Sequence, residues 1–415
     1  MGPITLFDKS FIEMLNVDES ALFDALFTAN ICPMYYVEVL ADLKLENPGK
    51  RTCEKVVSDL AAKTPVMRAY PNVIHTSLCL LELFGSPIEM RGAPVLAQGT
   101  PVRREGRVGV FYQESAEAKA FGRWQRREFL QLEHEFASQW RAQLKSTDHA
   151  ALAKLAKSAL RINAEPKNLE DAYALAKEVV HGKGQQALTL KTAYALLGLP
   201  HEYFAQIQER WKRQYQPVEE YAPYMAHCLL VDVFFHITVD KKLISPSRAS
   251  NKIDLSYLYY LPFAQIFVSN DKLHRRVSPL FLQPEQLFIG GQELKDDLKA
   301  LDAYYSKLPG NELAQGLFHV AARPPNDDLF LTTRLWKTLG HPVEPPRASP
   351  PEGPLSAYLL DRVRKLEEGA KSGVRETFEP SELRDPHEVS IQRLIPTKRG
   401  KWQLLPKDLT ASKAE

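Results

Sequence analysis

The sequence has few cysteines for its 415 residues, and they are widely scattered. Cys32, Cys53, Cys79 and Cys228 include no C-x-x-C pair, the spacing that many structural zinc sites use. Small secreted domains held together by disulfides carry many cysteines in a short chain. The sequence therefore argues against a disulfide framework or a structural zinc site, and it fits a reducing compartment.

Long apolar runs are also lacking. A membrane-spanning helix needs roughly 20 apolar residues in succession, and the most apolar stretch, residues 226–239, is interrupted by Asp232 and His236. That stretch is typical of a buried helix. The first residues reach Asp8 without a basic segment followed by an apolar run, so they predict no secretory signal. We predict a cytoplasmic protein with no membrane partner.

No charge of one sign dominates the chain. The net charge is +2, and hydrophobic and charged residues make up 44% and 25%, which are ordinary values for a globular protein. This balance neither requires nor excludes an anionic partner, so only local clusters of basic residues are informative. The length is that of two or three domains.

Two common catalytic motifs are absent as well. Gly290 and Gly291 fit neither G-x-G-x-x-G nor G-x-x-x-x-G-K-[ST], so a glycine-rich phosphate loop is not predicted. Ser10 and Ser269 have no nucleophile elbow and no paired base in the sequence, which argues against a serine hydrolase.

Short apolar runs alternate with helical patterns near both ends of the first 309 residues. Residues 4–7 predict a strand ending at Asp8, and residues 265–270 predict a buried strand ending at Asp271. The other elements expected near them are strands at 31–32 and 286–289 and helices at 21–28, 34–45, 217–239, 272–280 and 291–307. This alternation predicts an α/β fold with a parallel sheet covered by helices on both faces.

Residues 49–216 interrupt the alternation with a mainly helical insertion. Helices are expected at 52–62, 72–84, 169–180, 185–197 and 201–215, with a long amphipathic pattern at 116–161 and short strands at 87–112. We divide the chain into a core in two halves (1–48 and 217–309), the insertion, and a C-terminal extension (310–415). The extension holds short helical patterns at 311–339, a proline-rich linker at 342–354, a helix at 356–370 and a polar tail.

Four acids stand out by their positions in this pattern. Asp8 and Asp271 end parallel strands and are expected at the same sheet edge; Glu38 lies on the polar side of a helix, and Asp254 precedes the second of these strands. Converging carboxylates repel one another unless a cation neutralises them, and oxygen ligands without histidine or cysteine select Mg²⁺ or Mn²⁺. Taken singly, Asp8, Asp254 and Asp271 are also typical of helix caps and turns, and Glu38 of a solvated helix face.

The order of these motifs resembles the PIN-domain superfamily of metal-dependent ribonucleases. The matching features are Asp8-Lys9-Ser10 after a strand, Glu38 in the helix after the second strand, and Asp254 followed by Ser269-Asn270-Asp271. The resemblance covers about residues 1–48 and 217–307 and implies a three-layer α/β/α PIN-like domain that hydrolyses RNA or single-stranded DNA with Mg²⁺ or Mn²⁺. It assigns metal binding and catalysis to Asp8, Glu38, Asp254 and Asp271 and auxiliary roles to Ser10, Ser269 and Asn270. A catalytically inactive PIN-like module that binds nucleic acid or protein is the alternative.

The sequence departs from the family in its long insertion and in Ser269, where threonine is common. Asp232 competes with Asp254 for the role of third acid: its neighbours are more apolar, but its spacing to Asp271 fits less well. His75 and His274 have no partner at metal-ligand spacing and are expected to be structural.

Basic residues are candidates for contacts with phosphate groups. We predict nucleic-acid binding by Lys9, Arg123, Arg126, Arg127, Arg275 and Arg276, with Trp124 available to stack on a base. A solvated helix face with Trp124 in the core is the alternative. Trp402, in a basic tail, has the same two interpretations, and a tail docked on the body is the plainer one. The insertion and the C-terminal arm are the expected places for a protein partner or a second copy of the chain.

Overall fold

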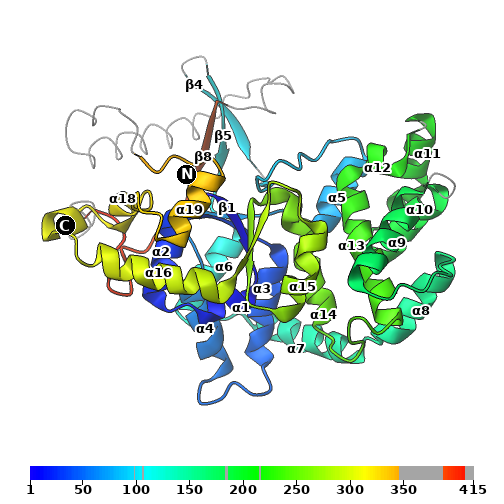
Figure 1. Cartoon of the computed structure of the whole chain (residues 1–415), viewed down its shortest axis with the longest axis horizontal. Coiled ribbons are helices and arrows are strands. Elements are labelled where there is room, and N and C mark those ends of the chain that lie inside the picture. The colour runs from blue at the N-terminus through cyan, green and yellow to red at the C-terminus, as the bar shows by residue number, and fades with distance from the viewer. Residues whose placement is uncertain (98, 105–106, 183–185, 215, 345–386, 407–415) are drawn as a thin grey trace.

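A five-stranded parallel sheet forms the centre of the molecule in the computed structural model (Figure 1). The structure describes residues 1–97, 99–104, 107–182, 186–214, 216–344 and 387–406. The strands lie in the order β3 (Ala69–Pro71), β2 (Thr28–Ile31), β1 (Ile4–Phe7), β6 (Ile266–Ser269) and β7 (Leu287–Gly290). The prediction of an α/β fold with a central parallel sheet is confirmed.

The central strands β1 and β6 lie side by side, although they are far apart in the sequence. Leu6, Phe7, Phe267 and Val268 are all 0% exposed, because helices cover both faces of the sheet. From β1 the chain builds β2 and β3 on one side and then β6 and β7 on the other. The boundary between β1 and β6 is therefore a topological switch point, and α/β proteins bind ligands in the crevice at the carboxyl ends of such strands.

Helices pack around the sheet, as a three-layer α/β/α arrangement requires. α1 (Lys9–Met14) contacts β6, η3 (Tyr257–Phe263) contacts β1, and both α15 (Lys272–Phe281) and α16 (Gly291–Tyr305) contact β7. The other helices near the sheet are α2 (Val17–Leu26), α3 (Pro33–Ala41), η1 (Asp42–Lys44), α4 (Cys53–Lys63), α5 (His75–Leu83) and α14 (Asn251–Ser256).

The edge strand β3 was not predicted from the sequence. It has only three residues and ends at Pro71, and proline is tolerated in a sheet mainly at an edge, where its missing N–H is not needed. Because β3 lies within residues 49–216, the sheet takes one strand from the range that sequence analysis assigned to the insertion.

Four helices of this range, α5, α8, α9 and α10, contact one long apolar helix, α13 (Pro223–Asp240). The amphipathic pattern at 116–161 is divided into three helices, α6 (Ala116–Gln125), α7 (Gln131–Ser146) and α8 (His149–Ala159). Arg127 interrupts it with a φ of 60°, and Asp148 caps the start of α8. The remaining elements are α9 (Leu169–His181), α10 (Gln186–Leu196), η2 (His201–Tyr203), α11 (Phe204–Gln214) and α12 (Val218–Tyr221).

The C-terminal arm is docked on the body. Three short helices, α17 (Gly310–Leu313), α18 (Leu317–Val320) and α19 (Leu331–Thr338), come first. The strand β8 (Glu388–Ile391) then pairs with β5 (Arg107–Tyr112) of the hairpin that β5 forms with β4 (Thr100–Arg104). The strands β9 (Lys398–Arg399) and β10 (Trp402–Gln403) follow. Arg399 is buried and lies 3.4 Å from Asp24, and Trp402 Nε1 donates to Asp302 Oδ1 at 2.9 Å. The docked-tail interpretation of Trp402 is therefore the correct one. The predicted helix at 356–370 and most of the proline-rich linker lie outside the described residues.

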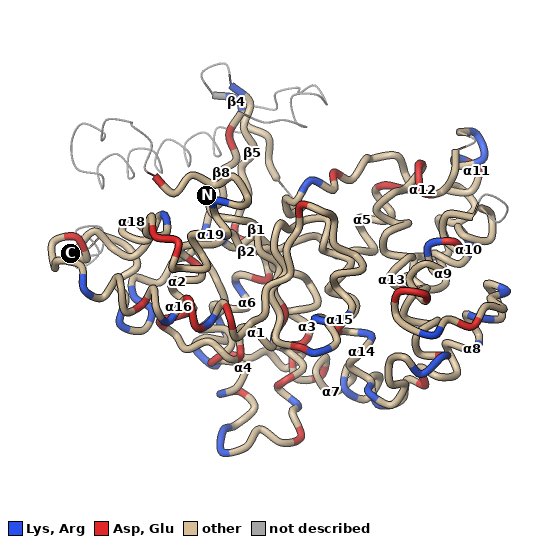
Figure 2. The backbone as a smooth tube through the Cα atoms, in the orientation of Figure 1, with Lys and Arg blue, Asp and Glu red and all other residues tan. Residues whose placement is uncertain are grey.

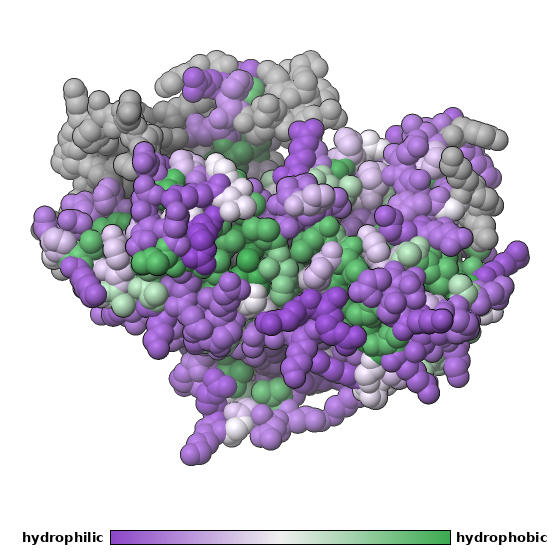
Figure 3. Space-filling model, in the orientation of Figure 1, coloured by the Kyte–Doolittle hydropathy of each residue, from purple (hydrophilic) through white to green (hydrophobic). Residues whose placement is uncertain are grey.

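Exposed and buried surfaces are divided in the usual way. None of the described helices is long and apolar enough to cross a membrane. Figure 3 shows a largely hydrophilic face with a band of apolar residues across its middle. Apolar atoms contribute roughly 55–60% of the accessible surface of folded proteins, so this band alone does not mark a binding site.

Candidate active site

Asp8 lies at the carboxyl end of β1, where the chain turns into α1. Its Oδ1 accepts the Phe11 N–H at 3.0 Å and so caps the helix. Ser10 Oγ donates to the same carboxylate at 2.9 and 2.8 Å, and Ser269 Oγ, at the end of β6, donates to Oδ2 at 2.7 Å. Asp8 is thus both a helix cap and the residue through which the ends of β1 and β6 are joined.

His274 lies directly against Asp8. Its Nδ1 is 3.2 Å from Asp8 Oδ2 and 2.8 Å from Ser269 Oγ, and its Nε2 is 2.6 Å from the Asp254 carbonyl oxygen. Burial lowers the pKa of an imidazole, but the hydrogen bond to Asp8 and the charge of that carboxylate outweigh it and raise the pKa of His274 to about 9. His274 is therefore a buried cation paired with Asp8, and a protonated imidazole cannot serve as the base of a serine hydrolase.

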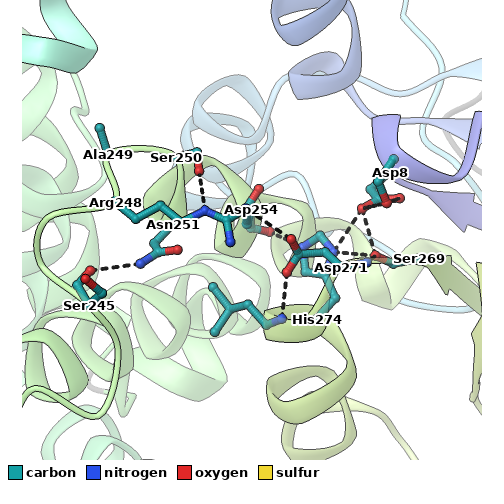
Figure 4. A network of polar contacts seen from close by, with 12 residues as sticks. Asp8, Ser245, Arg248, Ala249, Ser250, Asn251, Asp254, Ser269, Asp271 and His274 are labelled. Atoms are coloured by element: carbon teal, nitrogen blue, oxygen red, sulfur yellow. Dashed lines mark hydrogen bonds and ion pairs between the residues drawn. The ribbon is translucent and has the colours of Figure 1, made fainter. Parts of the chain in front are cut away.

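Asp254 and Asp271 share a second cation, Arg248 (Figure 4). Arg248 Nη2 lies 3.1 Å from Asp271 Oδ2 and 3.5 Å from Asp254 Oδ2. Asp271 also caps α15, because its Oδ1 accepts the Leu273 N–H at 2.6 Å. Asp254 lies within the short helix α14. The interpretation of Asp254 as a helix cap is therefore wrong, because Ser250 occupies the cap position.

The surroundings shift the pKa values of these two acids in opposite directions. Burial raises the pKa of Asp254 to about 6, with contributions from the charges of Asp271 and Asp8, while His274 and Arg248 oppose the shift. Burial also acts on Asp271, but the Leu273 N–H and the charges of His274 and Arg248 outweigh it and hold the pKa of Asp271 below its usual value.

Glu38 approaches the site from α3, which begins at Pro33 directly after β2. The hydroxyl of Tyr257 donates to Glu38 Oε2. Burial raises the pKa of Glu38 to about 7; Lys9 and Tyr257 oppose the shift, and the charges of Asp254 and Asp8 add to it. Lys9 itself lies 2.9 Å from Asp42 and 3.6 Å from Glu13, so it forms ion pairs at the side of the site.

The four predicted acids are therefore linked into one cluster at the switch point, which we call the acid cluster (Asp8, Glu38, Asp254 and Asp271). His274 contacts the carboxylate of Asp8 and the main-chain carbonyl oxygen of Asp254, and Arg248 pairs with the carboxylates of both Asp254 and Asp271. Glu38 contacts Tyr257, and the negative charges of Asp8 and Asp254 raise its pKa.

Asp232, the competing third acid, has other partners. Lys252 and Tyr259 both donate to its Oδ1. It is 1% exposed, inside the helical part of the chain, and its partner Lys252 lies two residues before Asp254 in the sequence. Asp254 is the acid that joins the cluster.

The three auxiliary residues lie at the carboxyl ends of β1 and β6: Ser10 in the first turn of α1, Ser269 at the end of β6 and Asn270 directly after it. Ser10 Oγ accepts the Asn270 N–H at 3.2 Å, and Ser269 Oγ accepts the Asp271 N–H at 2.9 Å. Together with their bonds to Asp8, these contacts hold the ends of β1 and β6 together, which fixes the carboxylate of Asp8 against β6.

The donor set fits a hard divalent cation, although its present arrangement does not enclose one. Carboxylate oxygens suit Mg²⁺ or Mn²⁺, and Asp254 Oδ2 is buried without a hydrogen-bond partner. Within the described residues, however, no three acidic, histidine or cysteine side chains are arranged to hold a metal ion. The reason is visible in the contacts: each carboxylate faces Arg248, His274 or Tyr257.

Apart from Lys9, which is paired with Asp42 and Glu13, the predicted nucleic-acid contacts fall into two groups. Arg275 and Arg276 are exposed on α15, immediately beyond Asp271. On α6, by contrast, Arg123 and Arg126 form ion pairs with Glu133 (2.6 Å) and Glu128 (2.8 Å), and Arg127 is exposed at the end of the helix. Figure 2 shows acidic and basic residues mixed around α3 and α15.

Trp124 does not have the role that was predicted for it. Its side chain is 3% exposed and its Nε1 donates to Glu133 at 3.0 Å. Its ring packs 4.8 Å from that of Phe121, which in turn stacks on Tyr35. The prediction that Trp124 stacks on a base is wrong, because the packing of α6 on α4 turns this side chain into the core.

Sequence analysis missed three residues of the site, Arg248, His274 and Tyr257. Arg248 lies in a loop without any periodic pattern, so no sequence signal singled it out. His274 was expected to be structural, and its one signal is its place in the first turn after Asp271.

No protein-family model, curated protein or solved structure matches this chain. The resemblance to the PIN-domain superfamily therefore stays a prediction.

Proposed function

We propose that this protein is a divalent-metal-dependent phosphodiesterase that cuts RNA or single-stranded DNA at the acid cluster. The observation that supports this most is the linkage of four acids from both halves of the chain around the carboxyl ends of β1 and β6. Two of them, Glu38 and Asp254, have raised pKa values of about 7 and about 6. Acids with such perturbed pKa values are concentrated in functional sites.

In this proposal Asp8, Glu38, Asp254 and Asp271 hold Mg²⁺ or Mn²⁺. A metal bound by such ligands supplies an activated water molecule and stabilises the charge on the leaving oxygen. The protein's own part is positioning. Ser10, Ser269 and His274 fix the carboxylate of Asp8, and Tyr257 fixes that of Glu38.

The exposed basic side chains on α15 are suited to the rim of such a site. Lys272, Arg275 and Arg276 extend from the helix that Asp271 caps, so a phosphate chain reaching the acids would pass close to them. Arg123 and Arg126 would first have to leave Glu133 and Glu128, which makes them weaker candidates.

A catalytically inactive module is the second candidate, and the two internal cations favour it. Arg248 and His274 neutralise the acids as a structural network would, without any metal. In that case the acid cluster stabilises the packing of β1 against β6, and nucleic acid or protein binds elsewhere on the surface of the chain.

The test measures cleavage of single-stranded RNA and DNA in the presence of Mn²⁺ by three full-length proteins: the wild type, Asp271→Asn and Asp296→Asn. Asp296→Asn is the matched control, because Asp296 lies at an exposed position on α16. We expect cleavage by the wild type and the control and a loss of roughly a hundredfold or more in Asp271→Asn. An inert wild type that still binds single-stranded nucleic acid would support the inactive module instead.

A further inference from the structure

Arg248 occupies the position between two acids where a cation is needed. Its Nη2 lies 3.1 Å from Asp271 and 3.5 Å from Asp254 (Figure 4). Asp254 Oδ2 makes no hydrogen bond to any described residue, so this ion pair is its one interaction with a described donor. Arg248 therefore neutralises the same two carboxylates that the proposed function assigns to a metal.

The side chain of Arg248 is largely exposed, while the loop that carries it is anchored. The side chain of Arg248 is 55% exposed, in contrast to 12% for Asp254 and 16% for Asp271. The loop itself is anchored by Asn251 Nδ2, which donates to the Ser245 carbonyl oxygen at 2.8 Å, and by His149 of α8, whose Nε2 lies 3.3 Å from the Ala249 carbonyl oxygen. More than half of the Arg248 side chain therefore already faces solvent, whereas the two acids that it pairs with are largely buried.

We propose that Arg248 is a built-in competitor of the divalent cation, bound to Asp254 and Asp271 until a metal ion displaces it. This inference rests on the proposed function, because it takes the acid cluster as the metal site. Competition follows from charge: a divalent cation and a guanidinium cannot both lie against one pair of carboxylates without strong repulsion. This proposal gives the helical part of the chain a function, because His149 of α8 helps to hold the loop that carries Arg248.

When a metal ion displaces Arg248 from the two acids, the guanidinium remains close to the metal ion and to the substrate bound there. Arg248 Nε donates to Ser250 Oγ at 3.0 Å, which limits how far the guanidinium can move. A freed guanidinium beside the acids is suited to a phosphate oxygen, which it binds with paired N–H donors.

The experiment measures Mn²⁺ binding by isothermal titration calorimetry to the full-length wild type, Arg248→Gln and Arg248→Lys, after removal of metal with EDTA. Arg213→Gln is the control, because it removes the same charge from an exposed position on α11. Thermal melts in EDTA check that each variant is folded. We expect Arg248→Gln to bind Mn²⁺ about two- to thirtyfold more tightly than the wild type, as befits the loss of two partly exposed ion pairs. Arg248→Lys should lie between them, and the control should match the wild type.

Each outcome decides a different claim. Equal or weaker binding by a folded Arg248→Gln, with measurable binding by the wild type, would overturn the competition while leaving the metal site intact. Binding by Arg248→Gln alone would support the competition in its strongest form. No binding by either folded protein at millimolar Mn²⁺ would overturn both this inference and the proposed function.

Discussion

At the scale of single residues, the buried ion pair between Asp8 and His274 is the contact of the site that we expect to contribute most to stability. Both side chains are buried, and removing one partner of a buried ion pair leaves the other charge uncompensated. We predict that Asp8→Asn lowers the free energy of unfolding by about 3 kcal/mol in urea titrations. Ser10→Ala, which removes one hydrogen bond to the same carboxylate, should cost only about 1 kcal/mol. Equal effects of the two substitutions would mean that the ion pair contributes nothing of its own.

The raised pKa of Glu38 predicts a dependence of stability on pH. A carboxyl group whose pKa rises on folding to about 7, from an unfolded value of about 4.3, stabilises the protein below the unfolded value, and this contribution is lost as the pH rises through about 7. Thermal melts in EDTA at pH 5 and pH 8 should therefore show Glu38→Gln gaining stability relative to the wild type at the higher pH. A difference between the two proteins that does not change with pH would contradict the assignment.

His274 does not disturb this comparison. Its pKa is raised to about 9, so its contribution to stability is complete below about pH 6.5 and is lost as the pH rises through about 9. Because both proteins keep His274, its contribution appears in both melts and is removed when they are compared.

At the scale of elements, the parts that position the acids could be predicted from the sequence. Apolar runs ending in Asp8 and near Asp271 indicated β1 and β6, because a strand buried on both faces is apolar throughout. β3 could not be predicted, because three residues carry no period. The position of Arg248 could not be predicted either, since the loop that carries it is fixed by contacts with distant residues such as His149.

The start of α13 is capped from another helix, which gives a prediction for this element. Glu82 on α5 is buried, and its two carboxylate oxygens accept the N–H groups of Tyr224 at 3.1 Å and Met225 at 2.9 Å. These donors have no partner within their own helix. Glu82→Ala should lower the free energy of unfolding by about 2 kcal/mol in urea titrations. Glu82→Gln, which keeps one acceptor, should cost less; a cost as large as that of alanine would show that charge rather than capping matters.

At the scale of the whole molecule, the C-terminal arm fastens distant parts of the chain together. Arg399 pairs with Asp24 on α2 and donates to the Thr64 carbonyl oxygen at 3.1 Å, and Arg393 Nη1 donates to the carbonyl oxygens of Val66 and Met67. We predict that Arg399→Met costs about 3 kcal/mol of unfolding free energy in urea titrations, because Asp24 stays buried without its cation. Lys398→Met, at an exposed neighbouring position, should change little. Similar small effects of both would indicate an arm that contributes no stability.

The arrangement of the whole chain also explains why the site needs both of its distant halves. Asp8 follows β1 and Glu38 lies on α3, whereas Asp254 lies on α14 and Asp271 follows β6, and the pairing of β1 with β6 brings these two halves together. The central claim is that these four side chains hold one divalent cation. The most direct test is a crystal soaked in Mn²⁺ and measured for anomalous scattering of manganese. We predict a peak about 2.1 Å from carboxylate oxygens of the acid cluster, with Arg248 turned away from Asp254 and Asp271. A map with no peak there and Arg248 still between the two acids would contradict the account.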